Sequence, residues 1–461
     1  FVSNTNWQAY SGETTLSYLT QMAGLTVQNF VSAATGIAVL FVLCRGFVRR
    51  ETKNLGNFWS DLVKITLYIL LPLSVVVCLI LVSQGVVQTL DPYASYTTLE
   101  GTQGVLPLGP AASQIAIKQL GTNGGGFFGA NSSTPFENPT VISNIVEMIS
   151  MMLLPGSCVV TFGLMLHDRK DGKKPLFGRQ GAVIFGAMAI IFLIGLAVCF
   201  SAERAGNPVV GSIGLSQDMG SMEGKETRFG MEQSALFTTV TTSFTTGTVN
   251  NMHDSLTPLG GLVPLLHMML NCVFGGKGVG LMNMVMYVIL AVFICGLMVG
   301  RTPEYLNKKI EGKEMKLVAI VILIHPLLIL GFSALAVSVQ GGLSGITNPG
   351  FHGLTQVLYE YASSAANNGS GFEGLADNSL FWNVTTGLAM FFGRYLAIAA
   401  QLAVAGSMLA KRRVNESVGT LRTDNTTFMI VLVFIVYIFA ALTFFPALAL
   451  GPVAEHLSLW M

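Results

Sequence analysis

The strongest constraint on this chain is a short polar segment, rich in Asn, Thr or Gly, that occurs four times at a nearly constant interval, each time before a long apolar run. The segments are Ser3-Asn4-Thr5-Asn6, Thr122-Asn123-Gly124-Gly125-Gly126, Thr245-Thr246-Gly247-Thr248 and Asn367-Asn368-Gly369-Ser370-Gly371. Asn123, Thr246 and Asn368 are 123 and 122 residues apart, and Asn4 precedes Asn123 by 119 residues. Because this period is too long for a solenoid, each unit is expected to be a small subdomain.

Composition indicates that these subdomains lie in a membrane. The chain is 51% hydrophobic and only 11% charged, whereas a soluble domain carries about 25% charged residues. Eight stretches are long and apolar enough to span a bilayer: 22–44, 62–87, 140–166, 181–200, 259–300, 316–339, 380–410 and 427–450. Glycine-rich backbone is tolerated at membrane depth only inside protein or along a watery path.

The distribution of basic residues predicts the orientation. Of the 25 Lys and Arg residues, 19 fall in four segments, Arg45–Lys64, Arg169–Arg179, Arg301–Lys316 and Lys411–Arg422. Under the positive-inside rule these segments are cytoplasmic, which puts the four polar segments on the external side. The chain is therefore predicted to be a multi-pass membrane protein with its basic loops in the cytoplasm.

Each complete unit has the same predicted order: a membrane helix, an external loop, a short pore helix, a polar filter and a second membrane helix. The predicted pore helices are Ala111–Leu120, Glu232–Thr242 and Gly353–Ala366. We therefore expect an all-α polytopic membrane protein with four pseudo-symmetric repeats around an ion pore. The expected divisions are repeat 1 at 1–53, repeat 2 at 54–180, repeat 3 at 181–315, repeat 4 at 316–415 and an extra transmembrane helix at 416–461. Repeat 1 is expected to be N-terminally incomplete, because only its filter and descending helix are visible.

The chemistry of the four segments favours a weakly hydrated monovalent cation. Such a filter replaces the hydration shell with a ring of neutral oxygens, mostly backbone carbonyls, and glycine permits the backbone angles that aim them inward. None of the four segments contains Asp, Glu, Lys or Arg, which argues against divalent cations and anions. Potassium is the predicted ion and sodium its main competitor. The alternative is that each segment is only a turn after a helix. That interpretation would be preferred for a single segment, but it does not explain four segments at equal spacing on the same side.

Three charged residues inside apolar runs have both a functional and a structural interpretation, because a charge at membrane depth is costly. Lys277 lies in Gly275-Gly276-Lys277-Gly278-Val279-Gly280, which breaks the overlong run 259–300. It either gates the ion path or pairs with a neighbouring group. Arg394 either faces the ion path or bridges helices. Glu147 either binds ions or is a structural partner.

Enzyme motifs are absent from the sequence. The segment around Lys277 superficially resembles a phosphate-binding loop, but Gly278 stands where that motif needs Ser or Thr. No soluble segment is long enough for a nucleotide-binding domain. The chain is predicted to be non-catalytic and to bind no nucleotide, so any ATP hydrolysis that drives transport belongs to another chain.

Four strings resemble the KdpA family, the potassium-binding, channel-like subunits of bacterial Kdp potassium-transporting ATPases. They are Asn4-Thr5-Asn6-Trp7-Gln8, Gly121-Thr122-Asn123-Gly124-Gly125-Gly126-Phe127-Phe128, Pro135-Phe136-Glu137-Asn138-Pro139-Thr140 and Asn367-Asn368-Gly369-Ser370-Gly371-Phe372. The resemblance implies the fold of the superfamily of potassium transporters. Members have ten membrane helices, whereas this chain has eight predicted spans. The resemblance therefore implies that the first two helices of the family are missing from this chain.

The resemblance also implies roles for individual residues. Potassium would be bound by the filter residues Asn4, Thr5, Thr122, Asn123, Gly124, Thr245, Thr246, Gly247, Asn367, Asn368 and Gly369. Gln8 would tune affinity, and Gly276, Lys277 and Gly278 would gate the exit. Arg394 and Arg301 would belong to the route by which the ion leaves sideways.

The partners implied are a P-type ATPase catalytic subunit, small accessory Kdp subunits and membrane lipids, with no nucleic acid. Two departures from symmetry stand out. Thr5 occupies a position that is glycine in the other repeats, and Thr248-Val249 replaces Gly-Gly or Ser-Gly. A free-standing channel or symporter of the Trk/Ktr/HKT type is the main alternative, and a membrane scaffold with degenerate filters is a third.

Overall fold

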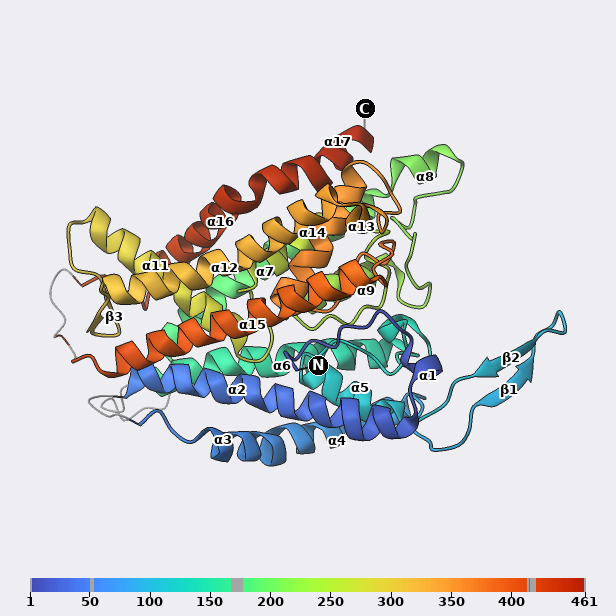
Figure 1. Cartoon of the computed structure of the whole chain (residues 1–461), viewed down its shortest axis with the longest axis horizontal. Helices are drawn as coiled ribbons and strands as arrows, with labels where there is room; N and C mark the ends of the chain where they lie inside the picture. The colour runs from blue at the N-terminus through green and yellow to red at the C-terminus, as the bar shows by residue number, and fades with distance from the viewer. Residues whose placement is uncertain (1, 50–53, 167–176, 413, 415–419, 460–461) are drawn as a thin grey trace.

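Long apolar helices running side by side dominate the computed structural model, which describes residues 2–49, 54–166, 177–412, 414 and 420–459 (Figure 1). Eight helical runs in these residues are long and apolar enough to cross a membrane. They are Thr20–Val48, Phe58–Ser83, Val141–Leu166, Arg179–Ser212, Val279–Met298, Gly312–Ser338, Leu380–Leu409 and Thr426–Leu459. The predicted all-α, multi-pass fold is confirmed.

Several of these runs contain more than one element. The first joins a π-helical turn (Thr20–Thr26) to α2 (Val27–Val48), and the second joins α3 (Phe58–Ile65) to α4 (Leu71–Ser83) through another π turn (Thr66–Leu70). The fourth joins α7 (Arg179–Ala205) to α8 (Pro208–Ser212). The last joins α16 (Thr426–Leu448) to α17 (Ala454–Leu459) across a kinked turn (Ala449–Val453). The remaining long helices are α6 (Val141–Leu166), α11 (Val279–Met298), α12 (Gly312–Ser338) and α15 (Leu380–Leu409).

Three shorter helices coincide with the predicted pore helices: α5 (Ala111–Leu120), α9 (Gly230–Ser243) and α14 (Phe351–Ala366). Most of their residues are buried. Each is enclosed by long helices, since α5 packs on α4 and α6, α9 on α7 and α10 (Pro258–Leu270), and α14 on α12 and α15. Because each polar segment begins where its pore helix ends, the pore helices position the filter.

The sequence explains where the helices begin. Asn425, Ser379 and Thr257 each accept the backbone N–H three residues further on, which satisfies a donor that has no partner inside the helix. A reciprocal capping box between Glu311 and Glu314 starts α12. At the other end, Asn367 terminates α14 in the left-handed conformation. These side chains determine the residues at which the helices begin and end.

The predicted interruption of the third descending helix is observed. The helix α10 ends at Leu270 and α11 begins at Val279, so residues 271–278 form the break. It begins four residues earlier than the Gly-rich string that predicted it, because Asn271 caps α10 in the left-handed conformation. The division of the whole chain into repeats stays a prediction.

Two short β-hairpins lie at opposite ends of the helix bundle. A β-hairpin of β1 (Ala94–Thr97) and β2 (Gln103–Leu106) projects from one end (Figure 1). The strands β3 (Glu304–Tyr305) and β4 (Lys308–Lys309) pair at the opposite end. The remaining short helices are α1 (Gly12–Thr15), a 3-10 turn (Asn131–Ser133) and α13 (Gln340–Leu343). The sequence analysis had no signal for the hairpin.

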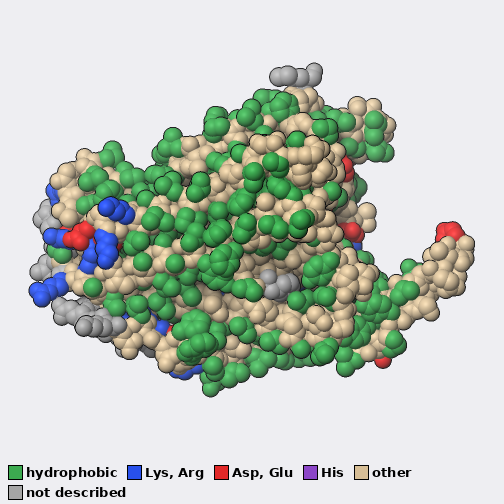
Figure 2. Space-filling model, in the orientation of Figure 1, with side chains coloured by type: hydrophobic (Ala, Val, Ile, Leu, Met, Phe, Trp, Pro, Cys, Tyr) green, Lys and Arg blue, Asp and Glu red, His purple; other side chains and the backbone are tan. Residues whose placement is uncertain are grey.

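The molecular surface is apolar around the middle and basic at one end. Figure 2 shows hydrophobic side chains covering the visible flank, and Lys and Arg gathered at the end that carries β3. On α4, for example, Val75, Val76 and Leu79 are exposed, as expected for side chains in contact with lipid. Seven of the basic residues counted above, Arg50, Lys53, Arg169, Lys170, Lys173, Lys174 and Arg413, lie outside the described residues.

Candidate ion filter

The filter segments share one backbone conformation. After α5, α9 and α14 the chain turns left-handed at Thr122, Thr245 and Asn367, with φ of 45°, 48° and 57°. Two residues later it is again positive at Gly124, Gly247 and Gly369, with φ of 92°, 96° and 111°. Only glycine adopts the second conformation without strain. The three segments are thus built alike, and glycine is required at the third position of each.

Repeats 2, 3 and 4 touch through these glycines. A Cβ added to Gly124 would collide with the carbonyl oxygen of Thr246, and one added to Gly247 would collide with the carbonyl oxygen of Asn368. Both contacts fall inside the 3.0 Å that real Cβ atoms keep. The backbones of these three segments therefore pack directly against one another, with a carbonyl oxygen of one segment facing the glycine of the preceding one.

Repeat 1 closes the ring. Thr5 Oγ1 lies 3.0 Å from the Cβ position of Gly369, which joins repeat 1 to repeat 4. On the other side, the backbone N–H of Asn6 donates to the Asn123 carbonyl at 2.9 Å, and Asn4 Nδ2 donates to the Thr122 carbonyl at 3.1 Å. The four segments predicted from their spacing thus meet around one point.

Repeat 1 is also where the ring departs from fourfold symmetry. Asn4 has a φ of 84° and lines the same cavity as Thr122 and Thr245, so it corresponds to the first left-handed residue of the other segments. Thr5 then corresponds to Thr246 and Asn368, because each of the three meets the glycine of the preceding segment. Asn6 stands where the other segments have glycine, and it is not among the residues with positive φ. The sequence alignment, which put Thr5 at the glycine position, is therefore wrong by one residue in repeat 1.

Several buried oxygens around the ring have no hydrogen-bond partner among the described residues. They are the hydroxyls of Thr5, Thr122, Thr245 and Thr246 and the side-chain carbonyls of Asn123 and Asn367. Buried polar atoms are nearly always paired, so a cluster of unpaired oxygens needs an explanation. A cation bound in the ring would supply the partner, and neutral oxygens suit potassium better than a divalent ion.

A cavity of about 220 Å³ lies directly beneath the ring. Its lining includes Asn4, Thr122, Thr245, Gly276, Lys277 and Arg394. The inner residues of three filter segments and the break in repeat 3 therefore face the same space. Two basic side chains, Lys277 and Arg394, thus line the cavity next to the ring.

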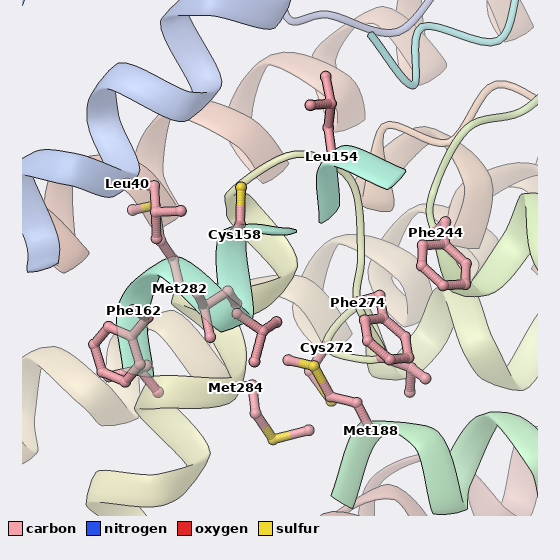
Figure 3. Close-up of a cluster of buried hydrophobic side chains, with 14 of the residues drawn as sticks. Leu40, Leu154, Cys158, Phe162, Met188, Phe244, Cys272, Phe274, Met282 and Met284 are labelled. Carbon is pink, nitrogen blue, oxygen red and sulfur yellow. The ribbon is translucent and has the colours of Figure 1, made fainter. Parts of the chain in front are cut away.

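The break at residues 271–278 is hydrogen-bonded to the residues directly before the repeat 3 filter. The backbone N–H groups of Gly275 and Gly276 donate to the carbonyls of Ser243 and Phe244 at 2.9 and 2.7 Å. The rings of Phe244 and Phe274 stack with centroids 4.6 Å apart, within the apolar cluster shown in Figure 3. Movement of this segment is thus coupled to the last turn of α9.

Lys277 and Arg394 differ in how they are held. Arg394 Nε donates to the Ser3 carbonyl at 3.0 Å, so this side chain both lines the cavity and ties α15 to the first filter segment. Lys277 is almost entirely buried. No described residue forms a hydrogen bond or ion pair with its ammonium group. The structural alternative for Lys277 therefore lacks a carboxylate partner in the described chain.

The comparisons with known proteins agree with this geometry. The family model described as Potassium-transporting ATPase A subunit, KdpA, matches residues 1–457. The chain belongs to the KdpA family. Relatives named potassium-transporting ATPase potassium-binding subunit include those of Clostridium acetobutylicum, 60% identical over 459 residues, and Geobacillus kaustophilus, 55% identical over 459 residues. Each alignment covers 100% of this chain and 80% of the relative.

A solved structure supports the fold of this KdpA chain independently. The potassium transporter TrkH from Vibrio parahaemolyticus is similar with a TM-score of 0.54 over 87% of this chain and 75% of TrkH. The sequence identity is 14%, so the likeness concerns the fold alone. Both the predicted family and the predicted fold class are thus confirmed.

Two residues singled out by the KdpA resemblance lie in different places. Gln8 reaches the second filter segment, where its Oε1 accepts from Gly126 N at 3.1 Å and its Nε2 donates to Gly126 O at 3.3 Å. Arg301 follows α11 at the basic end, exposed and outside the lining of the cavity beneath the ring. Gln8 is part of the candidate site in this KdpA chain, whereas a role for Arg301 stays a prediction.

A polar cluster at the N-terminal end of the repeat 4 pore helix of this KdpA protein was not among the features predicted from the sequence. His352 in the first turn of α14 contacts Asp254 at 3.1 Å and Glu455 at 2.8 Å. Burial lowers the pKa of His352, but the hydrogen bonds and charges of the two carboxylates outweigh it and raise the pKa to about 9. The charged imidazole cross-links the pore helix to α17.

Proposed function

We propose that this chain is the potassium-binding and translocating subunit of an ATP-driven potassium uptake complex. The observation that carries the proposal is the closed ring of four filter segments with unpartnered neutral oxygens and no carboxylate. Membership of the KdpA family supports a pump subunit over a free-standing Trk-type channel. Potassium would be held by the filter residues of Asn4–Thr5, Thr122–Gly124, Thr245–Gly247 and Asn367–Gly369.

The other chains of the complex follow from the same proposal. A P-type ATPase subunit would hydrolyse ATP, because this chain carries no nucleotide-binding motif. Small accessory Kdp subunits and membrane lipids would cover the apolar flanks. Potassium would pass from the ring into the cavity beneath it, past Gly276, Lys277 and Gly278, and leave along a route associated with Arg394 and Arg301. The repeats would divide at residues 53, 180, 315 and 415.

Potassium flux into proteoliposomes tests the function directly. With the complete complex, we expect uptake that requires ATP and stops when the ATPase subunit is inactivated. A P-type ATPase should also co-purify with this chain in mild detergent. Uptake at the same rate without ATP would favour the free-standing channel, and failure to bind potassium or rubidium would favour a scaffold.

We also propose that the filters face the periplasm of a bacterial inner membrane and the basic loops face the cytoplasm. The support is the clustering of Lys and Arg at one end of the bundle (Figure 2). Cysteines introduced at the exposed positions Glu100 and Glu223 should react with an impermeant thiol reagent from outside. A cysteine at the exposed position Lys309 should react only from the cytoplasmic side. Reaction from the wrong side would reverse the orientation.

A further inference from the structure

A buried charged cluster lies directly behind the outer end of the repeat 2 filter. Lys118 on α5 forms an ion pair with Glu137 from the loop before α6, and both side chains are fully buried. A second carboxylate, Glu147 on α6, is also fully buried. Burying a lysine and two glutamates is expensive, and an ion pair is often no more stabilising than a hydrophobic replacement. Stability alone is therefore a weak reason for this cluster.

The ion pair touches the backbone of the filter. The position of a Cβ at Gly126 lies 2.7 Å from Glu137 Oε2, 2.8 Å from Asn131 Oδ1 and 3.0 Å from Lys118 Nζ. From another repeat, the Gln8 amide group forms two hydrogen bonds with the same residue, Gly126. Gly126 is thus enclosed by the ion pair and by Gln8, which leaves its peptide little freedom to turn.

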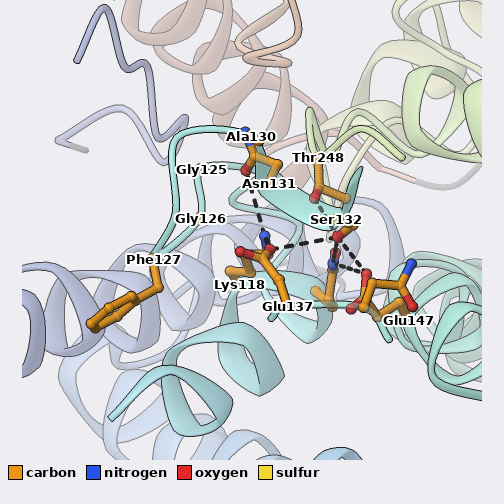
Figure 4. Close-up of polar contacts among 12 residues, drawn as sticks. Lys118, Gly125, Gly126, Phe127, Ala130, Asn131, Ser132, Glu137, Glu147 and Thr248 are labelled. Atoms are coloured by element: carbon orange, nitrogen blue, oxygen red, sulfur yellow. Dashed lines mark hydrogen bonds and ion pairs between the residues drawn. The ribbon is translucent and has the colours of Figure 1, made fainter. Parts of the chain in front are cut away.

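The cluster also reaches the filter of repeat 3. Ser132 Oγ donates to Glu147 at 2.5 Å and lies 3.1 Å from Thr248 Oγ1 (Figure 4). Gln119 Nε2 donates to the same Glu147 oxygen at 2.8 Å. Thr248 is the residue that breaks the glycine pattern of the filters, and this contact gives its hydroxyl a partner. One polar network thus joins the outer ends of two neighbouring filter segments.

We infer that the Lys118–Glu137 pair, together with Ser132 and Glu147, positions the outer ends of the second and third filter segments and thereby sets ion selectivity. These are positioning residues, because they act through Gly126 and Thr248 and none of them is a filter residue. The inference rests on the proposed function. A filter whose carbonyl spacing is held rigidly discriminates between ions of different size better than one that relaxes around either ion.

The test is the dependence of ATPase activity on potassium, sodium and rubidium in the purified complete complex. A single substitution would leave one member of the ion pair without its partner, so both members are replaced together in Lys118→Met/Glu137→Gln, while Glu147 keeps its hydrogen bonds from Gln119 and Ser132. We expect the apparent KM for potassium to rise about tenfold and sodium to stimulate at lower concentrations, with the maximal rate nearly unchanged.

A second buried pair provides a matched control. Lys225 and Glu203 lie 2.6 Å apart, both fully buried, and neither is among the nearest neighbours of Gly124, Gly126, Gly247 or Gly369. The variant Lys225→Met/Glu203→Gln should alter thermal stability and leave the apparent KM and ion preference unchanged. Equal KM changes in the two double variants, or no change in either, would overturn the inference.

A milder variant covers the case in which the double variant does not assemble. Ser132→Ala keeps the ion pair but removes the contacts to Glu147 and Thr248, and we expect the apparent KM for potassium to rise about threefold. Wild-type KM and ion preference in Ser132→Ala would overturn the inference. The wild-type complex separates the two proposals: if potassium does not stimulate it, the proposed function fails, whereas normal stimulation with unchanged variants counts against the inference alone.

Discussion

Replacing Gly124 by serine is expected to raise the apparent KM of the complex for potassium by about tenfold or more and to weaken discrimination against sodium. Gly124 has a φ of 92°, and a Cβ there would collide with the Thr246 carbonyl oxygen in the neighbouring segment of the ring. The backbone strain alone is about 1–2 kcal/mol, and every 1.4 kcal/mol is about tenfold in affinity. Potassium-stimulated ATPase activity measures both effects.

Gly101 provides the matched control for this substitution. It has a similar φ of 83°, but it lies in the hairpin between β1 and β2, and no atom of the described residues lies within 4 Å of its Cβ position. Gly101→Ser therefore introduces comparable backbone strain away from the filter and should leave the apparent KM unchanged. If Gly124→Ser has wild-type kinetics, the second segment is not part of the filter. If both variants raise KM, the effect does not come from the ring.

The fold was predictable where the chain gives periodic or compositional signals. The pore helix Ala111–Leu120 was predicted with its observed bounds, because a polar segment directly follows it and marks its end. The break in repeat 3 was predicted from consecutive glycines. The β1–β2 hairpin was not predicted, since its short strands are mostly exposed and carry no alternating apolar pattern. Apolar runs and the polar segments that end them were thus enough to locate the helices. The hairpin was missed because it has no buried face that would give its strands a sequence pattern.

The sequence predicted which residues form the candidate site, but it did not predict the contacts between them. Spacing identified the four segments, but it could not show that Gly124 meets Thr246 or that Gln8 binds Gly126, because those contacts depend on how the repeats pack. Glu147 was recognised as a charge at membrane depth with two possible roles. The structure gives it hydrogen-bond partners in Gln119 and Ser132, which supports the structural role.

The ion pair behind the filter had a signal that the sequence analysis did not use. Lys118 is the only charged residue of the pore helix Ala111–Leu120, and a lysine at that depth needs a nearby anion. Several acidic residues follow within the same repeat, and composition does not choose among them. The fold determines which carboxylate pairs with Lys118, because the loop that carries Glu137 turns back over the end of α5.

Removing the charge of Lys277 is expected to increase the passive flow of potassium through the complex several-fold and to loosen the coupling of transport to ATP hydrolysis. Lys277 lines the cavity beneath the ring together with Thr122 and Arg394, and it is almost entirely buried. A cation 4 Å from a potassium ion repels it by about 4 kcal/mol at an effective dielectric constant of about 20, and water in the cavity reduces this value. Potassium flux into proteoliposomes without ATP measures the leak.

Three variants separate a gating charge from a packing residue. Lys277→Ala removes the charge and should leak, whereas Lys277→Arg keeps the charge in the cavity and should hold potassium back. Lys309→Ala removes an exposed lysine at the basic end of the bundle and should leave the leak unchanged. The gating role is wrong if Lys277→Ala lowers the yield of assembled complex while the leak stays at the wild-type level. A leak that appears in Lys277→Ala alone would identify the ammonium group as the barrier beneath the filter, because the glycines on both sides of it are unchanged.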